Sequence, residues 1–174
     1  MTFEVLIEEG DIKKITIYEE GQKKPLQTIT EVDPEADCEP LGMFSYFDED
    51  INFDGYNDFK FTCWRGATGN EGFRYLIYNK VKKKFYFSRQ FVYFTGINAD
   101  QKRKVITSFR NQGFAGRIYV ADTYKWIKGK LILIEEERQA PSENDPNKFL
   151  KVKKKRIKGK MTVVEQETLD IDNL

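Results

Sequence analysis

Short runs of β-branched and aromatic residues, separated by single polar residues, are the feature that most constrains how this 174-residue chain folds. Clear examples are Phe3-Val5-Ile7, Phe59-Phe61-Cys63 and Phe73-Tyr75-Ile77. A period of two places alternate side chains on one face of an extended strand, whereas an amphipathic helix needs a period near 3.6 residues. The pattern predicts a mainly β fold of antiparallel strands, arranged as a sandwich or as a partly closed, propeller-blade-like sheet.

Polar turn residues divide the chain between these runs. Lys128-Gly129 and Lys158-Gly159 are typical of two-residue hairpin turns. Polar stretches with prolines predict loops over residues 32–42 and 138–147, and only residues 98–108 suit a helical turn. Further strands are expected over residues 12–17, 26–30, 85–89, 117–121, 124–127, 130–136, 148–157 and 160–167.

We expect a single domain over residues 1–174, with a tail at 170–174 that frays, because one hydrophobic core is usual at this length. Lysine and arginine total 29 and aspartate and glutamate 28, so the net charge of +1 gives no attraction to nucleic acid or acidic lipid. The basic run from Lys151 to Lys160 is expected on an exposed edge strand, where lysines discourage aggregation. Binding of an anionic polymer is the alternative for this run.

No apolar run approaches the roughly 20 residues that a membrane-spanning helix needs. The first residues have the pattern of a strand and not of a signal peptide, so the protein is either cytoplasmic or has lost its signal. The two cysteines, Cys38 and Cys63, are too few for a disulfide framework or a zinc site. One bridge between them is an open alternative in an oxidising compartment.

The chain contains no histidine. This removes the usual proton shuttle near neutral pH, the Ser-His and Cys-His nucleophile pairs, and most zinc and haem ligation. A hydrolase that uses two carboxylates, such as Asp48 and Glu49, is an alternative, but adjacent residues of a strand point to opposite faces. We therefore expect a binding protein and not an enzyme.

The segment from Asp50 to Asp58 carries the strongest chemical signal, with upstream residues from 48 belonging to the same loop. Calcium takes six to eight oxygen ligands, and a loop supplies them when alternate residues turn inward. Gly55, at the sixth loop position, permits the sharp turn that this requires. The predicted ligands are the side chains of Asp50, Asn52, Asp54 and Asp58 and the main-chain carbonyl of Tyr56.

An EF-hand and an acidic turn without a metal are the two alternatives to a short calcium loop. An EF-hand has glutamate at loop position twelve, where this chain has Phe61, so the loop is of the shorter kind found between β-strands. An acidic turn without a metal is the simpler alternative. Carboxylates gathered around one point repel one another without a cation between them, which favours calcium. We expect the ion to stiffen the strands that flank the loop.

A family resemblance rests on motifs spread over about residues 45–135. They are Asn52–Phe59, Gly66–Asn70, Tyr75–Asn79, Tyr124–Trp126 and Gly129–Leu131. Together they resemble bacterial secreted proteins that are similar to the periplasmic inhibitors of invertebrate-type lysozyme. Relatives of that family act as immunity proteins against peptidoglycan-cleaving effectors delivered between bacteria. The calcium loop alone is also similar to the loops of FG-GAP and VCBS repeats.

The resemblance implies a periplasmic or secreted β domain with bound calcium, whose loops plug a lysozyme-like cleft. Within it, Gly66–Phe73 is the segment expected to enter the cleft, where a neighbouring arginine would pair with a catalytic carboxylate. A plain connecting loop is the alternative for this segment. The expected partner-binding residues are Arg65, Gly66, Thr68, Gly69, Asn70 and Arg74.

Two classes of function follow from these observations. The leading hypothesis is a calcium-stabilised inhibitor or immunity protein that occludes a peptidoglycan hydrolase. The alternative is a calcium-dependent adhesion or carbohydrate-binding module, in which calcium and surface aromatics meet a glycan. Five aromatic residues are expected in the core or in cross-strand pairs, and not on a surface that would bind a glycan. They are Tyr75, Tyr78, Phe85, Tyr124 and Trp126.

Overall fold

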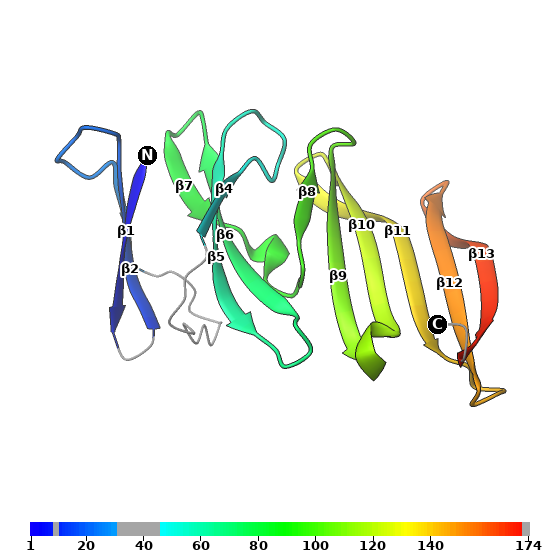
Figure 1. Ribbon diagram of the computed structural model, residues 1–174. Helices are drawn as coiled ribbons and strands as arrows, with labels where there is room; N and C mark the ends of the chain where they lie inside the picture. The colour runs from blue at the N-terminus through cyan, green and yellow to red at the C-terminus, as the bar shows by residue number, and fades with distance from the viewer. Residues whose placement is uncertain (9–10, 31–45, 172–174) are drawn as a thin grey trace. The chain divides into compact units, whose positions relative to one another are not determined.

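A computed structural model describes residues 1–8, 11–30 and 46–171, which form three antiparallel sheets (Figure 1). The prediction of a mainly β fold is confirmed. In every sheet the strands follow chain order, so each strand pairs with its neighbours in sequence. Within the described residues, no helix is long and apolar enough to cross a membrane.

The chain falls into two compact units. Unit 1 comprises Met1–Arg65 and Glu71–Tyr93, and unit 2 comprises Gly66–Asn70 and Phe94–Leu174. The single domain expected over residues 1–174 stays a prediction. The loop expected over residues 32–42 and the frayed end at 172–174 lie outside the described residues, while Asp170 still belongs to a strand.

Unit 1 holds two of the sheets, with the 3₁₀ turn η1 (Arg89–Phe91) after the second. The three-stranded sheet consists of β1 (Thr2–Glu8), β2 (Asp11–Tyr18) and β3 (Gln27–Ile29). The four-stranded sheet consists of β4 (Tyr46–Glu49), β5 (Asp58–Arg65), β6 (Glu71–Asn79) and β7 (Lys84–Phe87). The strand expected to reach residue 89 ends at Phe87, because Arg89 begins the 3₁₀ turn.

The two sheets of unit 1 share one apolar cluster. Ile15 and Ile17 of β2 pack in it with Phe59, Phe61, Leu76 and Phe85 of β5, β6 and β7. Phe3 of β1 stacks on Phe59 with ring centroids 4.1 Å apart. Aromatic and aliphatic side chains of both sheets thus bury apolar surface together, which is the dominant favourable term in folding.

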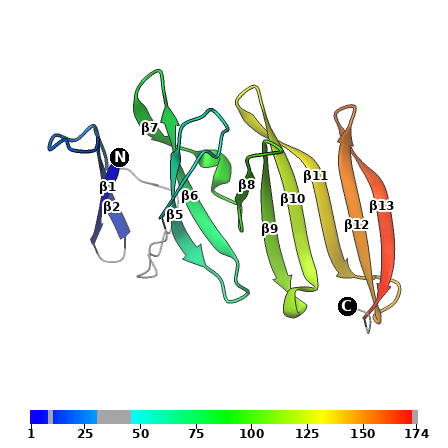
Figure 2. The same cartoon turned by 45° about the horizontal axis from the view of Figure 1, so that its top comes forward.

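Unit 2 holds the six-stranded sheet, in which the strands from β8 to β13 lie side by side (Figures 1 and 2). A 3₁₀ turn, η2 (Phe114–Gly116), connects its second and third strands. The strands are β8 (Asn98–Asp100), β9 (Val105–Gly113), β10 (Ile118–Ile127), β11 (Lys130–Pro141), β12 (Lys148–Ile157) and β13 (Lys160–Asp170).

The two Lys-Gly hairpin turns are confirmed. Both residues of each turn have positive φ, 51° and 75° at Lys128 and Gly129, and 48° and 84° at Lys158 and Gly159. Two consecutive left-handed residues match the right-handed twist of the flanking strands. Glycine at the second position is therefore required by the backbone.

The helical turn expected at 98–108 is wrong, because β8 and β9 occupy this segment with a short turn between them. The Asp100 side chain accepts hydrogen bonds from the backbone N–H groups of Lys102 (3.0 Å) and Arg103 (2.8 Å). Lys104 then takes a left-handed φ of 54°. A local carboxylate–backbone turn competes with helix formation and reverses the chain.

Two more boundaries differ from expectation. The loop expected at 138–147 begins only after Pro141, because β11 continues to pair with β12 as far as Pro141 opposite Phe149. The separate strands expected at 117–121 and 124–127 are one strand, β10, with a bulge between Thr123 and Tyr124. A bulge keeps the strand paired while its twist increases.

The expectation that the basic run lies on an edge strand is wrong for most of its residues. Lys151 to Arg156 lie on β12, between β11 and the edge strand β13, both of which carry glutamates, while Lys158 is in the turn and Lys160 begins β13. Glu135, Glu136 and Glu137 are paired in register with Lys155, Lys154 and Lys153, at nitrogen–oxygen distances of 3.4, 3.0 and 3.3 Å. The charges of Lys153, Lys154 and Lys155 are thus compensated by cross-strand glutamates within the sheet.

Gly72 of β6 faces Trp64 of β5, and a Cβ atom at Gly72 would lie 2.1 Å from the indole nitrogen. We expect Gly72→Ala to lower the free energy of unfolding by about 1–3 kcal/mol, because the ring must shift within a packed sheet. Urea denaturation measures the change. In a Trp64→Leu background the same substitution should cost less, and an equal cost in both backgrounds would contradict this assignment.

Candidate functional site

The loop between β4 and β5 folds its polar side chains back onto its own backbone. The Asp50 carboxylate accepts hydrogen bonds from the N–H groups of Asp54 (3.0 Å) and Gly55 (2.9 Å). The Asn52 side-chain oxygen also accepts from Asp54 N–H, at 3.0 Å, and Asp54 accepts from Tyr56 N–H at 3.0 Å. The side chains at loop positions one, three and five therefore turn into the loop.

Two residues of the loop have left-handed backbone conformations. Phe53 has a φ of 62° and Gly55 a φ of 90°. Only glycine adopts the second value without strain, and a Cβ there would meet no atom within 4 Å. Gly55 is thus required by the backbone torsion and not by crowding.

Asp58, the first residue of β5, is buried, with 1% of its surface exposed. One carboxylate oxygen accepts from Ile51 N–H at 3.1 Å and the other from Tyr78 N–H at 2.8 Å. This carboxylate therefore joins the start of the loop to strands β5 and β6. Burial raises the pKa of Asp58 to about 7, while the two backbone donors act to lower it. The negative charges of Asp54 and Asp50 raise it further.

The donor chemistry of this loop suits calcium, although its carboxylates do not converge as a metal cluster. In the described part of the chain, no group of three or more His, Cys, Asp and Glu side chains is placed to hold a metal ion. The predicted set also draws on the Asn52 amide and the Tyr56 carbonyl, so all its donors are oxygen atoms, as calcium prefers. Each carboxylate oxygen that accepts one backbone N–H retains a further lone pair. A cation would relieve the repulsion that Asp54 and Asp50 exert on Asp58.

Glu49, just before the loop, is occupied by an interior ion pair. Its carboxylate lies 2.7 Å from the Lys60 ammonium and accepts a hydrogen bond from the Tyr75 hydroxyl at 3.1 Å. Lys60 is 8% exposed and Tyr75 is fully buried. This arrangement does not favour Glu49 as a calcium ligand or as one half of a catalytic carboxylate pair.

The Gly66–Asn70 segment is a tight turn fixed to β9. Within it, Gly69 N–H donates to the Gly66 carbonyl at 3.0 Å. The side chain of Asn70 donates to the Asn111 carbonyl at 2.7 Å and accepts from Asn111 N–H at 2.8 Å. The Asn111 side chain in turn donates to the Thr68 carbonyl at 3.1 Å. The turn is thus held by specific hydrogen bonds on both sides of one asparagine pair.

The two arginines beside this turn have different surroundings. Arg65 is half-exposed and forms an ion pair with Glu71. Arg74 is 4% exposed, and its guanidinium donates to the carbonyls of Phe73 (3.2 Å) and Val92 (3.3 Å). Arg65 is thus the more accessible of the two arginines. For Arg65, Arg74 and the turn residues, partner binding stays a prediction.

A second loop was missed by sequence reasoning. The connection from β9 to β10 lies at one end of the six-stranded sheet (Figure 2). It contains Phe114, whose side chain is 53% exposed. Four successive residues, 113–116, have positive φ, including 52° at Phe114 and 53° at Ala115. Such non-glycine conformations store strain, which is concentrated at functional sites. The signal in the sequence is an aromatic residue between two glycines, Gly113 and Gly116.

This second loop is adjacent in sequence to the asparagine that holds the Gly66–Asn70 turn. The Asn111 side-chain oxygen accepts a hydrogen bond from Gly113 N–H at 2.9 Å. The Phe114 ring packs on Phe149 with centroids 5.5 Å apart, and the Arg117 guanidinium lies 5.9 Å from the same ring. We refer to Gly66–Asn70 with Asn111–Arg117 as the double-turn surface of unit 2.

The aromatics expected in the core or in strand pairs behave as predicted where the structure describes contacts. Tyr78 and Phe85 are directly opposite each other on β6 and β7, with ring centroids 5.1 Å apart. Tyr124 stacks on Phe94 at 4.7 Å and donates a hydrogen bond to Asp122 at 3.1 Å. None of these residues forms an exposed platform.

Cys63 of β5 is 1% exposed and disulfide-bonded. The other cysteine of the chain, Cys38, lies outside the described residues. A half-cystine in a central strand of the four-stranded sheet places the covalent link next to the buried aromatic residues of unit 1.

Comparisons with known proteins identify the fold and no more. No family model and no curated protein matches the chain. A solved structure described as a Xanthomonas type IV secretion system related protein is similar, with a TM-score of 0.61 and 21% sequence identity. The match covers 87% of this chain and 78% of that one. At this level of identity the likeness concerns architecture alone.

The calcium assignment predicts a ligand-specific loss of stability. We expect Asp54→Ala to lower the melting temperature more in calcium than in EDTA. Loss of the hydrogen bond to Tyr56 N–H acts in both buffers, whereas a bound ion would stabilise the native state only where calcium is present. Melting curves of both proteins in calcium and in EDTA measure this. An equal shift in the two buffers would mean that the loop holds no metal.

The buried Asp58 carboxyl predicts a pH dependence in EDTA. Its pKa is about 7 in the folded chain, against 3.8 for an ordinary aspartate, so between these pH values the native state holds a proton that the unfolded state releases. We therefore expect stability to fall as pH rises from about 4 to about 7. Urea unfolding across this range measures the slope, and Asp58→Asn should flatten it. An unchanged slope in the variant would remove Asp58 as its source.

Proposed function

We propose that this chain is a calcium-binding, extracytoplasmic inhibitor or immunity protein that binds and occludes a lysozyme-like peptidoglycan hydrolase. Calcium would be held by the side chains of Asp50, Asn52, Asp54 and Asp58 and by the Tyr56 carbonyl. Its chemistry there is that of a structural cation, which neutralises the carboxylates and fixes the loop.

The double-turn surface is the observation that carries the binding role. It presents an exposed aromatic, Phe114, from a backbone that is held in place by the Asn70–Asn111 hydrogen bonds. A preorganised loop loses little conformational entropy when it enters a cleft. Aromatic residues and arginine are also the commonest anchors of protein interfaces, and Arg117 lies beside Phe114.

Two further observations support an extracytoplasmic location and a role as an immunity-type protein. A disulfide at Cys63 is chemistry of an oxidising compartment, such as the periplasm or the cell exterior. The structural neighbour is described as related to a type IV secretion system. A secretion-related neighbour is in keeping with the resemblance to immunity proteins against effectors that are delivered between bacteria.

The test is inhibition of a peptidoglycan hydrolase by the full chain. We expect one class of muramidase to be blocked in a turbidity assay of cell-wall lysis, with a stoichiometric complex in size-exclusion chromatography. Phe114→Ala should weaken the complex tenfold or more, by about 1.4 kcal/mol or above, because the exposed ring is its anchor.

A matched control is Tyr86→Ala, since Tyr86 is similarly exposed (51%, against 53% for Phe114) but lies on β7 of unit 1. It should leave the complex intact. Absence of a complex with every class of lysozyme would overturn the proposed function. Equal weakening by the two variants would instead remove the double-turn surface as the contact.

A further inference from the structure

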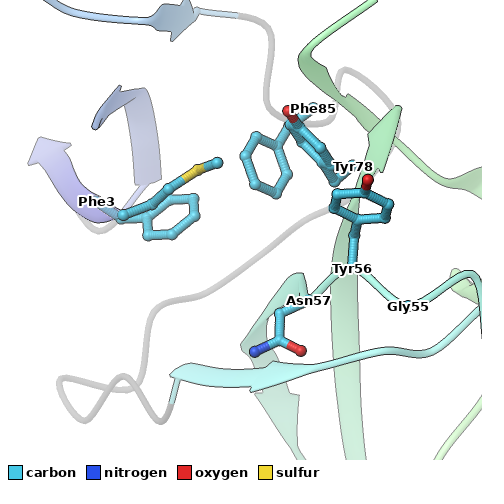
Figure 3. A pocket seen from close by; sticks show the side chains of 7 residues that line it. Phe3, Gly55, Tyr56, Asn57, Tyr78 and Phe85 are labelled. Atoms are coloured by element: carbon cyan, nitrogen blue, oxygen red, sulfur yellow. The ribbon is translucent and has the colours of Figure 1, made fainter. Parts of the chain in front are cut away.

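A cavity of about 360 Å³ lies in unit 1 beside the calcium loop (Figure 3). One side is formed by Gly55, Tyr56 and Asn57 of the loop, and the remainder by residues of β1, β6 and β7 with Met1. Its size is within the range of small-molecule sites, at the lower end. The loop proposed to hold calcium is therefore also a wall of this cavity.

The aromatic walls of the cavity support one another. Tyr56 and Tyr78 have ring centroids 5.5 Å apart, and Phe3 meets Phe85 edge to face at 5.4 Å. Tyr56 is 45% exposed although Phe85 is buried, so a ligand would reach the ring of Tyr56 first. Rings that brace one another form a binding surface that needs little ordering when a ligand arrives.

The polar groups of the cavity have no hydrogen-bond partner among the described residues. The Asn57 amide and the hydroxyls of Tyr56 and Tyr78 form no hydrogen bond with any residue in the described ranges. Amides and phenols can both donate and accept, so they can bind hydroxyl groups of either orientation. A purely apolar ligand would leave these groups unmatched as it displaced water, at a cost.

The charges around the cavity restrict the class of ligand. Among the described residues, the lining side chains are uncharged, while the Met1 α-amino group belongs to the lining and the Lys80 ammonium lies 5.8 Å from the centroid of the Tyr56 ring. A ligand cation would lose hydration without gaining a counter-charge from these groups. A molecule with an apolar face and several hydroxyls suits the rings and the amide, which describes a saccharide ring.

We propose that this cavity binds a pyranose ring, stacked on Tyr56 and hydrogen-bonded by Asn57. This activity is separate from occlusion of a hydrolase by the double-turn surface, which uses residues of unit 2. It depends on the proposed calcium loop only for the position of Tyr56 and Asn57. A glycan site next to a hydrolase inhibitor would hold the protein at the polymer that its target cleaves.

The experiment uses the full chain, labelled for two-dimensional NMR and titrated with chitotriose and with cellotriose in calcium. We expect saturable shifts of the Gly55, Tyr56 and Asn57 amides with at least one of the two sugars. Tyr56→Ala should weaken binding about tenfold or more through loss of the stacking ring, and Tyr56→Phe should retain it. Tyr93→Ala, which removes an 86% exposed tyrosine outside the cavity, should have no effect.

The outcomes separate this site from the proposed function. Absence of shifts with both sugars overturns the saccharide site, even when the hydrolase complex forms. Protection of Tyr56 in a hydrolase complex without any sugar binding overturns it as well and makes the cavity a protein contact. Sugar binding that persists in EDTA supports the site, and it counts against calcium as the element that holds the loop.

Discussion

Asp58 is a buried carboxylate at the point where the polar loop meets the four-stranded sheet, and both candidate sites of unit 1 depend on it. Its oxygens hold Ile51 at the start of the loop and Tyr78 in β6. Tyr56 and Asn57, which line the cavity, immediately precede it. Burial of a carboxylate near two other acids is unfavourable unless donors or a cation compensate. The loop conformation and the position of the aromatic cavity residues are therefore coupled through one side chain, as would be the proposed binding of calcium.

The two units are stabilised in different ways. Unit 1 buries interlocked aromatic rings, such as the Phe3–Phe59 stack, between the residues of two sheets. In unit 2, by contrast, the long strands carry rows of charged side chains. Glu136 shows how burial and ion pairing act in opposite directions on one of these charges. Burial acts to raise its pKa, but hydrogen bonds from Lys154 and Arg138 outweigh this and the pKa is lowered. Paired charges on a sheet surface add little to stability individually. Their register nevertheless opposes strand slippage, because a shift by one residue would move every charge to the other face.

The strands of unit 1 could be predicted from sequence because their alternation is simple, and the Lys-Gly turns because two left-handed residues have a clear signature. The segment around Asp100 was misassigned, since its lysines and arginine suit a helix until the local turn at the carboxylate is known. The loop side chains of the candidate site were identifiable by spacing. The burial of Arg74 could not be identified from sequence, because it depends on a contact with Val92, which is distant from Arg74 along the chain. Phe114 was missed for the same reason, as its exposure is a property of the whole sheet.

Strand order has a consequence for how this chain is assembled. Because each strand pairs only with the preceding and the following strand of its sheet, no sheet waits for a segment made much later. Contacts between near neighbours close short loops, which lose less entropy than long ones. A chain that emerges with its N-terminus first can therefore complete one hairpin after another, because each new strand pairs with the edge of the strand made just before it.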